Sequence, residues 1–165
     1  MQLVESHIIL PNNEFFIECD NLCLKTKNLY NSSLYVIRQA YIKDKTNLLY
    51  NLHHLMKDTE QYKALPAKVS STVLLTIQKN FKSFFKSNAD FYNNPSKYNS
   101  KPKLPKYLDT NSGRLFASYT NQAISKKVFK KTNKIQYIEK WNGSYGEGNV
   151  FNSEQLTLLK NVGKR

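Results

Sequence analysis

Residues 64–107 read ALPAKVSSTVLLTIQKNFKSFFKSNADFYNNPSKYNSKPKLPKY, and they join a basic amphipathic helix to a loop rich in lysine, proline and tyrosine. Pro66 is preorganised for the first helical position, and the apolar spacing predicts a helix to about Phe91. Its expected apolar face comprises Val69, Val73, Ile77, Phe81, Phe84 and Phe85. A second face carries Lys68, Lys79, Lys82 and Lys86. Such a lysine face is more often plain solvation than a binding surface, so the segment that follows decides its interpretation.

That segment, residues 93–113, interleaves prolines and tyrosines with further lysines. Proline keeps the backbone extended, lysine meets phosphates, and tyrosine offers a flat face on which a base can stack. The lysines are Lys97, Lys101, Lys103 and Lys106. The alternative is an ordinary proline-rich connector. Helix and loop together favour a surface that faces nucleic acid.

The charge of the 165-residue chain is concentrated in the same region. Residues 1–60 carry six Lys/Arg against seven Asp/Glu, residues 61–140 sixteen against three, and residues 141–165 three against two. The whole net charge of +13 therefore lies in the middle eighty residues. A field localised in this way attracts polyanions and gives non-specific affinity for phosphates.

The pattern of apolar residues along the rest of the chain predicts strands around one group of helices. The expected strands are residues 3–10, 114–119 and 134–139, and the expected helices run from about Asn13 to Tyr41, from Asn47 to Lys57 and from Pro66 to Phe91. The predicted fold class is α+β, a small β-barrel-like domain with an inserted three-helix bundle. The predicted divisions are 1–12 (first strand), 13–92 (helical insertion), 93–113 (basic loop), 114–140 (remaining strands) and 141–165 (divergent, disordered tail).

The chain offers little for catalysis or metal binding. Cys19 and Cys23 are four apart on one expected helix, which favours small buried side chains in a reducing compartment. The three histidines lack metal-ligand spacing, so no metal and no cofactor is expected. Beyond residue 60 the acids are widely spaced, and no catalytic motif is present. The first ten residues, MQLVESHIIL, lack a basic leader, and no membrane span is evident, which predicts a soluble, cytoplasmic protein.

Four blocks of the chain resemble one family. LCLKTKNLYNSSLYVIRQAY (22–41), YKALPAKVSSTVLLTIQKNFKSFFK (62–86), NPSKYNSKPKLPKY (94–107) and YTNQAISKK (119–127) are similar to the N-terminal region of the insertion-sequence OrfB/TnpB proteins, transposon-encoded RNA-guided DNA endonucleases. The resemblance covers roughly residues 1–130. It implies a β-barrel "wedge" domain with a helical recognition lobe, which binds guide RNA and target DNA. Cleavage, and its Mg²⁺, belong to a downstream RuvC-like domain that is not in this chain, so a truncated copy is expected.

The resemblance also implies which residues contact the DNA motif beside the target. These positions are Tyr50, Asn51, Lys68, Ser71, Thr120 and Asn121, and the basic run after them includes Lys126 and Lys127. Asn, Ser and Thr can hydrogen-bond to base edges while Lys fixes the phosphate backbone. The expected function is therefore that of a nucleic-acid-binding fragment of a transposase-like endonuclease, without catalysis of its own. The alternatives are a basic module that binds an acidic protein, or an enzyme with an unrecognised site.

Overall fold

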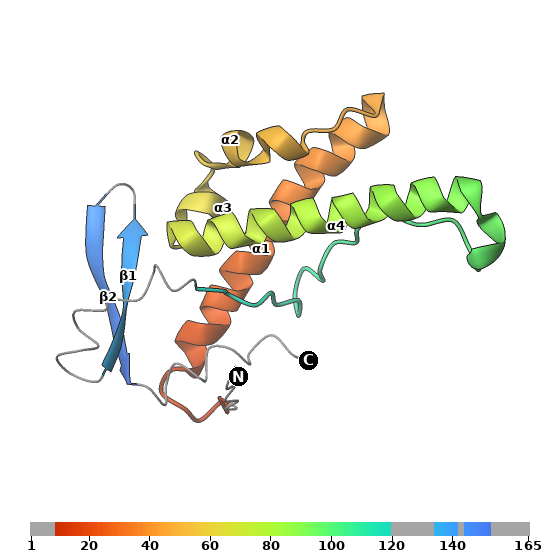
Figure 1. The fold of residues 1–165 in the computed structure, drawn as a ribbon. Coiled ribbons are helices and arrows are strands. Elements are labelled where there is room, and N and C mark those ends of the chain that lie inside the picture. Colours follow the sequence, from red (N-terminus) through yellow and green to blue (C-terminus); the bar gives the residue numbers. More distant parts are fainter. Residues whose placement is uncertain (1–8, 120–133, 142–143, 153–165) are drawn as a thin grey trace, which may run out of the picture.

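The structure, a computed structural model, describes residues 9–119 in full and the backbone of residues 134–141 and 144–152. Two long helices cross each other in Figure 1, with the shorter helices against one side of the crossing. In chain order the elements are α1 (Phe16–Asp44), the 3₁₀ turn η1 (Leu49–Asn51), α2 (Leu52–Met56), α3 (Glu60–Lys63), α4 (Ala67–Asn93), the 3₁₀ turn η2 (Pro95–Lys97), β1 (Lys134–Trp141) and β2 (Ser144–Asn152). Among the described helices, none is both long enough and apolar enough to cross a membrane.

The core lies where α1 and α4 cross. Both helices repeat apolar residues at three- and four-residue intervals, so each presents one continuous stripe to the other. The fully buried side chains there include Leu29, Leu34 and Ile37 from α1 and Ile77 and Phe81 from α4. A ring cluster extends this core along α4, with Tyr41 packed edge-on against Phe84 at a centroid distance of 5.9 Å. The crossing sets the position of α4, and so of its exposed side chains, relative to α1.

The short helical elements close one end of the core. Leu49, Leu52 and Met56 are buried against the long helices. The Gln78 side chain on α4 donates a hydrogen bond to the Leu49 carbonyl over 2.8 Å, which ties η1 to α4. Thr59 caps α3 by accepting from the Tyr62 amide at 3.4 Å.

Residues 98–119 form an extended segment that we call the strap. It leaves the far end of α4 and returns beneath that helix (Figure 1). Its contacts then follow α1 in the opposite direction, from Arg38 at Pro105 to Asp20 at Arg114. Its apolar residues Leu104, Leu108, Leu115, Ala117 and Tyr119 pack against the edge of the core. The strap carries most of the proline- and lysine-rich sequence.

The predicted β-barrel with an inserted bundle is wrong. Residues 9–119 are organised by helices and contain no strand. Residues 114–119, expected to be a strand, are extended but lie on a helix instead, because the Leu115 amide donates to the Cys23 carbonyl of α1 over 3.2 Å. The expected strand at 3–10 falls mostly outside the described residues, and its last two positions are not in a strand.

The described strands form one antiparallel hairpin. β1 contains the expected strand at 134–139 and pairs with β2, from Lys134 opposite Asn152 to Trp141 opposite Ser144, with one irregularity between Gln136 and Ile138. β2 lies where the sequence predicted a disordered tail. Two strands do not make a barrel.

The two long helices and the short helix between them were predicted correctly. α1 and α4 lie within three residues of their expected boundaries, and the short helix expected at 47–57 is η1 followed by α2. The side-chain oxygen of Asn13, the expected start of the first helix, accepts from the Phe15 amide at 2.9 Å, just before α1 begins. The four-residue helix α3 was not predicted.

Candidate nucleic-acid interface

The exposed face of α4 carries a row of lysines. Lys79, Lys82 and Lys86 are three and four residues apart, so they share one side of the helix, and all three are exposed. None of them forms an ion pair with another residue of the described segment. We call these three residues the lysine row. Lys68 lies on the same side of α4 in its first turn and is also exposed.

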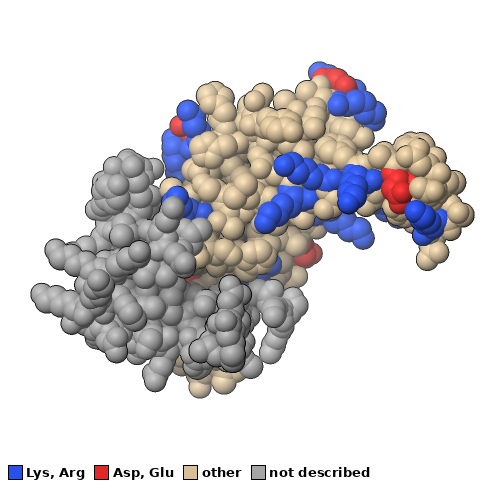
Figure 2. Space-filling model, in the orientation of Figure 1, with Lys and Arg blue, Asp and Glu red and all other residues tan. Residues whose placement is uncertain are grey.

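The positive charge is visible on the surface. Figure 2 shows Lys and Arg side chains running across the middle of one face, over α4 and the chain beneath it. An acidic spot lies toward the far end of the same face (Figure 2). At that end Asp90 accepts hydrogen bonds from Tyr98 (2.8 Å) and Asn94 (3.0 Å), which hold the pKa of its carboxyl group below the usual value. One permanent negative charge therefore offsets the lysines there.

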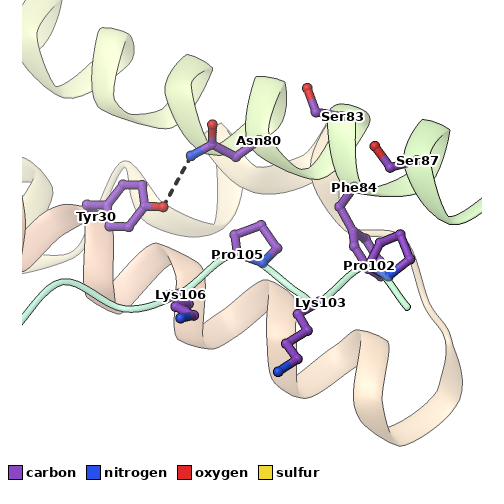
Figure 3. Close-up of a pocket in the computed structure, with 9 residues that line it drawn as sticks. All are labelled: Tyr30, Asn80, Ser83, Phe84, Ser87, Pro102, Lys103, Pro105 and Lys106. Carbon is purple, nitrogen blue, oxygen red and sulfur yellow. Dashed lines mark hydrogen bonds between the residues drawn. The ribbon is translucent and has the colours of Figure 1, made fainter. Parts of the chain in front are cut away.

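Two strap lysines line a groove next to the lysine row. The groove is a hollow of about 350 Å³ between α4 and the strap. Tyr30 and Asn80 close one end, and Figure 3 shows the hydrogen bond of 3.2 Å between them. The complete lining is Tyr30, Asn80, Ser83, Phe84, Ser87, Pro102, Lys103, Pro105 and Lys106. Lys103 and Lys106, predicted from sequence as phosphate contacts, are thus brought to the same region as the lysine row.

The other two predicted lysines of this region have local partners. Lys97 lies 3.9 Å from the Asp90 carboxylate. Lys101 donates to the Tyr92 hydroxyl over 2.8 Å, and its ammonium lies 5.1 Å from the centre of that ring. Both side chains remain exposed. They contribute charge at the far end of α4 but are held close to protein groups.

A series of polar contacts from α1 holds the strap in place. Asn31 makes two hydrogen bonds with the Leu108 backbone, donating to its carbonyl (2.9 Å) and accepting from its amide (3.0 Å). Lys27, only 3% exposed, donates to the Thr110 carbonyl over 2.7 Å. Arg38 donates to the Pro105 carbonyl. We call these three side chains the α1 clasps.

An ion pair fixes the end of the strap. Arg114 meets the Asp20 carboxylate with two hydrogen bonds of 2.7 and 2.9 Å. This pairing lowers the pKa of Asp20, chiefly through the hydrogen bond from Arg114, against a smaller opposing effect of burial. The strap is therefore attached to α1 from Pro105 to Leu115, and the positions of Lys103 and Lys106 depend on that attachment.

The residues expected to read DNA bases fall into two groups. Tyr50 and Asn51 lie at η1, where Tyr50 is 86% exposed. Ser71 lies on α4 and is partly used internally, since its hydroxyl donates to the Ala67 carbonyl (2.8 Å) and lies 3.3 Å from the Tyr62 hydroxyl. The Tyr62 hydroxyl lies 3.3 Å from the Ser71 hydroxyl and 3.1 Å from Nε2 of His53, so the start of α2, which directly follows Tyr50 and Asn51, lies close to Ser71. Thr120, Asn121, Lys126 and Lys127 lie outside the described residues.

The two cysteines are buried side chains of α1. Cys19 and Cys23 are free thiols, and each is less than 5% exposed. Burial, with smaller effects of Cys23 and Glu18, raises the pKa of Cys19 to about 11. Burial likewise raises the pKa of Cys23. Such thiols stay protonated near neutral pH and are poor nucleophiles. Within the described residues, no cluster of His, Cys, Asp or Glu could hold a metal ion.

Sequence reasoning missed several groups in this region. No functional role was predicted for Tyr30, Asn80, Ser83 or Ser87, yet all four line the groove. The α1 clasps were missed as well. The signal available was the polar residues beside the apolar stripe of α1, which need a partner when they lie near a core.

Comparison with known proteins adds no relative. No protein-family model, no curated protein and no solved structure matches the chain. The function is therefore inferred from the geometry and charge of the surface itself.

Proposed function

We propose that this chain binds nucleic acid through the lysine row and the two strap lysines, Lys103 and Lys106. It would do so as a cytoplasmic, non-catalytic part of an RNA-guided transposon endonuclease of the kind its sequence blocks resemble. Guide RNA and target DNA are the partners that this resemblance implies. Neither a cofactor nor a bound metal is part of the proposal.

The observation that carries the proposal is the grouping of five exposed lysines at one groove: Lys103 and Lys106 line it, and each member of the lysine row directly precedes a lining residue of α4. Three come from α4 and two from the strap, and none is ion-paired with another described residue. Lysines left without acidic partners repel one another across a shared surface, and a polyanion relieves that repulsion. Phosphates that approach this surface also release their condensed counterions, which is the main source of non-specific affinity.

The test measures how affinity depends on salt. Fluorescence anisotropy of the whole chain with labelled RNA and DNA should give a linear fall of log affinity with log salt concentration. If all five lysines contact phosphates, the slope is about −3.5 on single strands and about −4.5 on B-form DNA. Changing Lys79, Lys82 and Lys86 together to Gln should make the slope shallower by about 2 to 3.

A matched triple variant provides the control. Lys25, Lys43 and Lys57 are also exposed but belong to α1 and the segment after α2. Their change to Gln alters the net charge equally and should leave the slope nearly unchanged if the lysine row makes the contacts. A slope near zero for the unchanged protein would contradict the proposal. Displacement of RNA by an acidic protein at equal charge would favour the interaction-module alternative, and metal-dependent cleavage would favour an enzyme.

A further inference from the structure

The groove between α4 and the strap combines an apolar floor with polar edges. Phe84, Pro102 and Pro105 supply the apolar surface: Figure 3 shows Phe84 extending from α4 toward the strap, and the two prolines on the strap itself. Ser83 and Ser87 belong to the α4 wall, while Lys103 and Lys106 leave the strap on the other side (Figure 3). Phe84 also packs in the ring cluster of the core, and its partly exposed side joins the two prolines to give the groove an apolar surface.

The polar groups of the groove retain unused hydrogen-bonding capacity. Asn80 donates one N–H to the Tyr30 hydroxyl, and its carbonyl oxygen and other N–H make no further hydrogen bond within the described residues. The hydroxyls of Ser83 and Ser87 likewise have no partner there. An amide with one donor and one acceptor available is the side chain that can pair with the edge of a base.

These features distinguish between forms of nucleic acid. A duplex hides the faces of its bases in the stack, so it could use only the lysines of this site. A single strand can turn a base out, place its flat face on an aromatic side chain and leave its phosphates on nearby cations. An acidic peptide could pair with Lys103 and Lys106, but its carboxylates would gain nothing from the apolar floor.

We propose that the groove holds one unpaired nucleotide of a single-stranded nucleic acid. The base lies on Phe84 and Pro102 with its edge at Asn80, and the adjoining phosphates lie at Lys103 and Lys106. This inference rests on the proposed function and makes it more specific. It predicts that the protein prefers single strands to duplexes at equal charge.

The experiment compares labelled 24-nucleotide single strands of RNA and DNA with blunt 12-base-pair duplexes, which carry nearly the same number of phosphates and no unpaired base, at one fixed salt concentration. The whole chain should bind the single strands at least about fivefold more tightly, because stacking of one base contributes that much or more. Phe84→Leu and Asn80→Ala should each weaken single-strand binding, Phe84→Leu by about fivefold or more, and leave duplex binding unchanged.

The choice of variants separates an effect on the groove from an effect on folding or on charge. Phe84 also packs against the core, so Asn80→Ala, at an exposed position, tests the site without that packing. Asn28→Ala removes an exposed amide from α1 and should change neither affinity. The lysine-row variant should weaken both forms, since its charges do not distinguish them.

The outcomes separate the two proposals. Equal or tighter binding of duplex, with both forms equally affected by Asn80→Ala, would overturn the groove proposal and leave the nucleic-acid function standing. Salt-independent or absent binding of every probe would overturn both. Displacement of the single strand by polyglutamate at equal charge would show that the groove recognises acidic chains, and would overturn the nucleotide assignment.

Discussion

Asn31 is the residue whose replacement tests how the strap is held. It is the one α1 clasp that makes two hydrogen bonds to the strap, both to the backbone of Leu108. Each such bond contributes a net 0.5–1.5 kcal/mol, so Asn31→Leu should lower the free energy of unfolding by about 1–3 kcal/mol. For a chain of this size the melting temperature should fall by roughly 2–12 °C. Because water can reach this partly buried site and hydrogen-bond to the Leu108 backbone in the variant, we expect both losses to lie in the lower half of their ranges.

The matched control is Asn28→Leu. Asn28 lies on the same helix and is exposed, and its side chain makes no hydrogen bond to another described residue. Because both variants replace Asn by Leu inside α1, the change in helix propensity is the same. Thermal unfolding followed by circular dichroism gives the difference between the two variants. Hydrogen exchange adds a local measure, since the Leu108 amide should lose protection in Asn31→Leu alone. Equal melting temperatures and an unchanged Leu108 amide would refute the clasp.

Two further predictions concern the end of the strap. The pKa of Asp20 is lower in the folded protein, so its pair with Arg114 stabilises the fold above the unfolded-state pKa near 4 and is lost as the pH falls through the folded-state value. Asp20→Asn should therefore cost about 0.5–1 kcal/mol at pH 7 and nothing in strong acid, and equal stability of the two proteins at pH 7 in urea titrations would contradict this. A Cβ at Gly113 would lie 2.3 Å from the Asp109 carbonyl oxygen, so Gly113→Ala should cost about 1–3 kcal/mol in the same assay. Ser112→Ala, which changes the exposed residue before Gly113, should lower the free energy of unfolding by less. A larger loss for Ser112→Ala than for Gly113→Ala would show that the backbone at Gly113 accommodates a Cβ at no cost.

The long helices were predictable because their signal is local and repeated. Each turn of α4 adds another apolar residue on the same side, so an error at one position does not change the result. Phe81 and Ile77 were expected in the core and are fully buried there. The exposed lysines of α4 follow from the same periodicity. The periodicity does not show whether their surface binds a partner, since a lysine face that is only solvated has the same pattern.

The strap was not predictable by the same means. Alternation in Arg114–Tyr119 indicated a strand, and it correctly separates Leu115 and Ala117, which pack on the core, from the exposed Phe116. An extended chain shows that period whether its neighbour is a strand or a helix. The partner of Leu115 is Cys23 of α1, more than ninety residues earlier, and nothing near either residue indicates it. The error in fold class therefore came from inferring a sheet from a local extended pattern.

The buried Lys27 shows that the fold depends on the polar residues of α1 as well as on its apolar stripe. Its ammonium group is inside the protein because the strap carbonyl of Thr110 accepts from it, so the strap is needed to satisfy α1 as much as α1 is needed to hold the strap. Arg38 and Asn31 make the same kind of contact nearer the groove. The apolar stripe of α1 thus places α4, and its polar side places the strap. Lysines from α4 and from the strap reach one surface only because both partners are attached to the same helix. The groove therefore depends on α1, which holds both of its walls, although α1 contributes only Tyr30 to its lining.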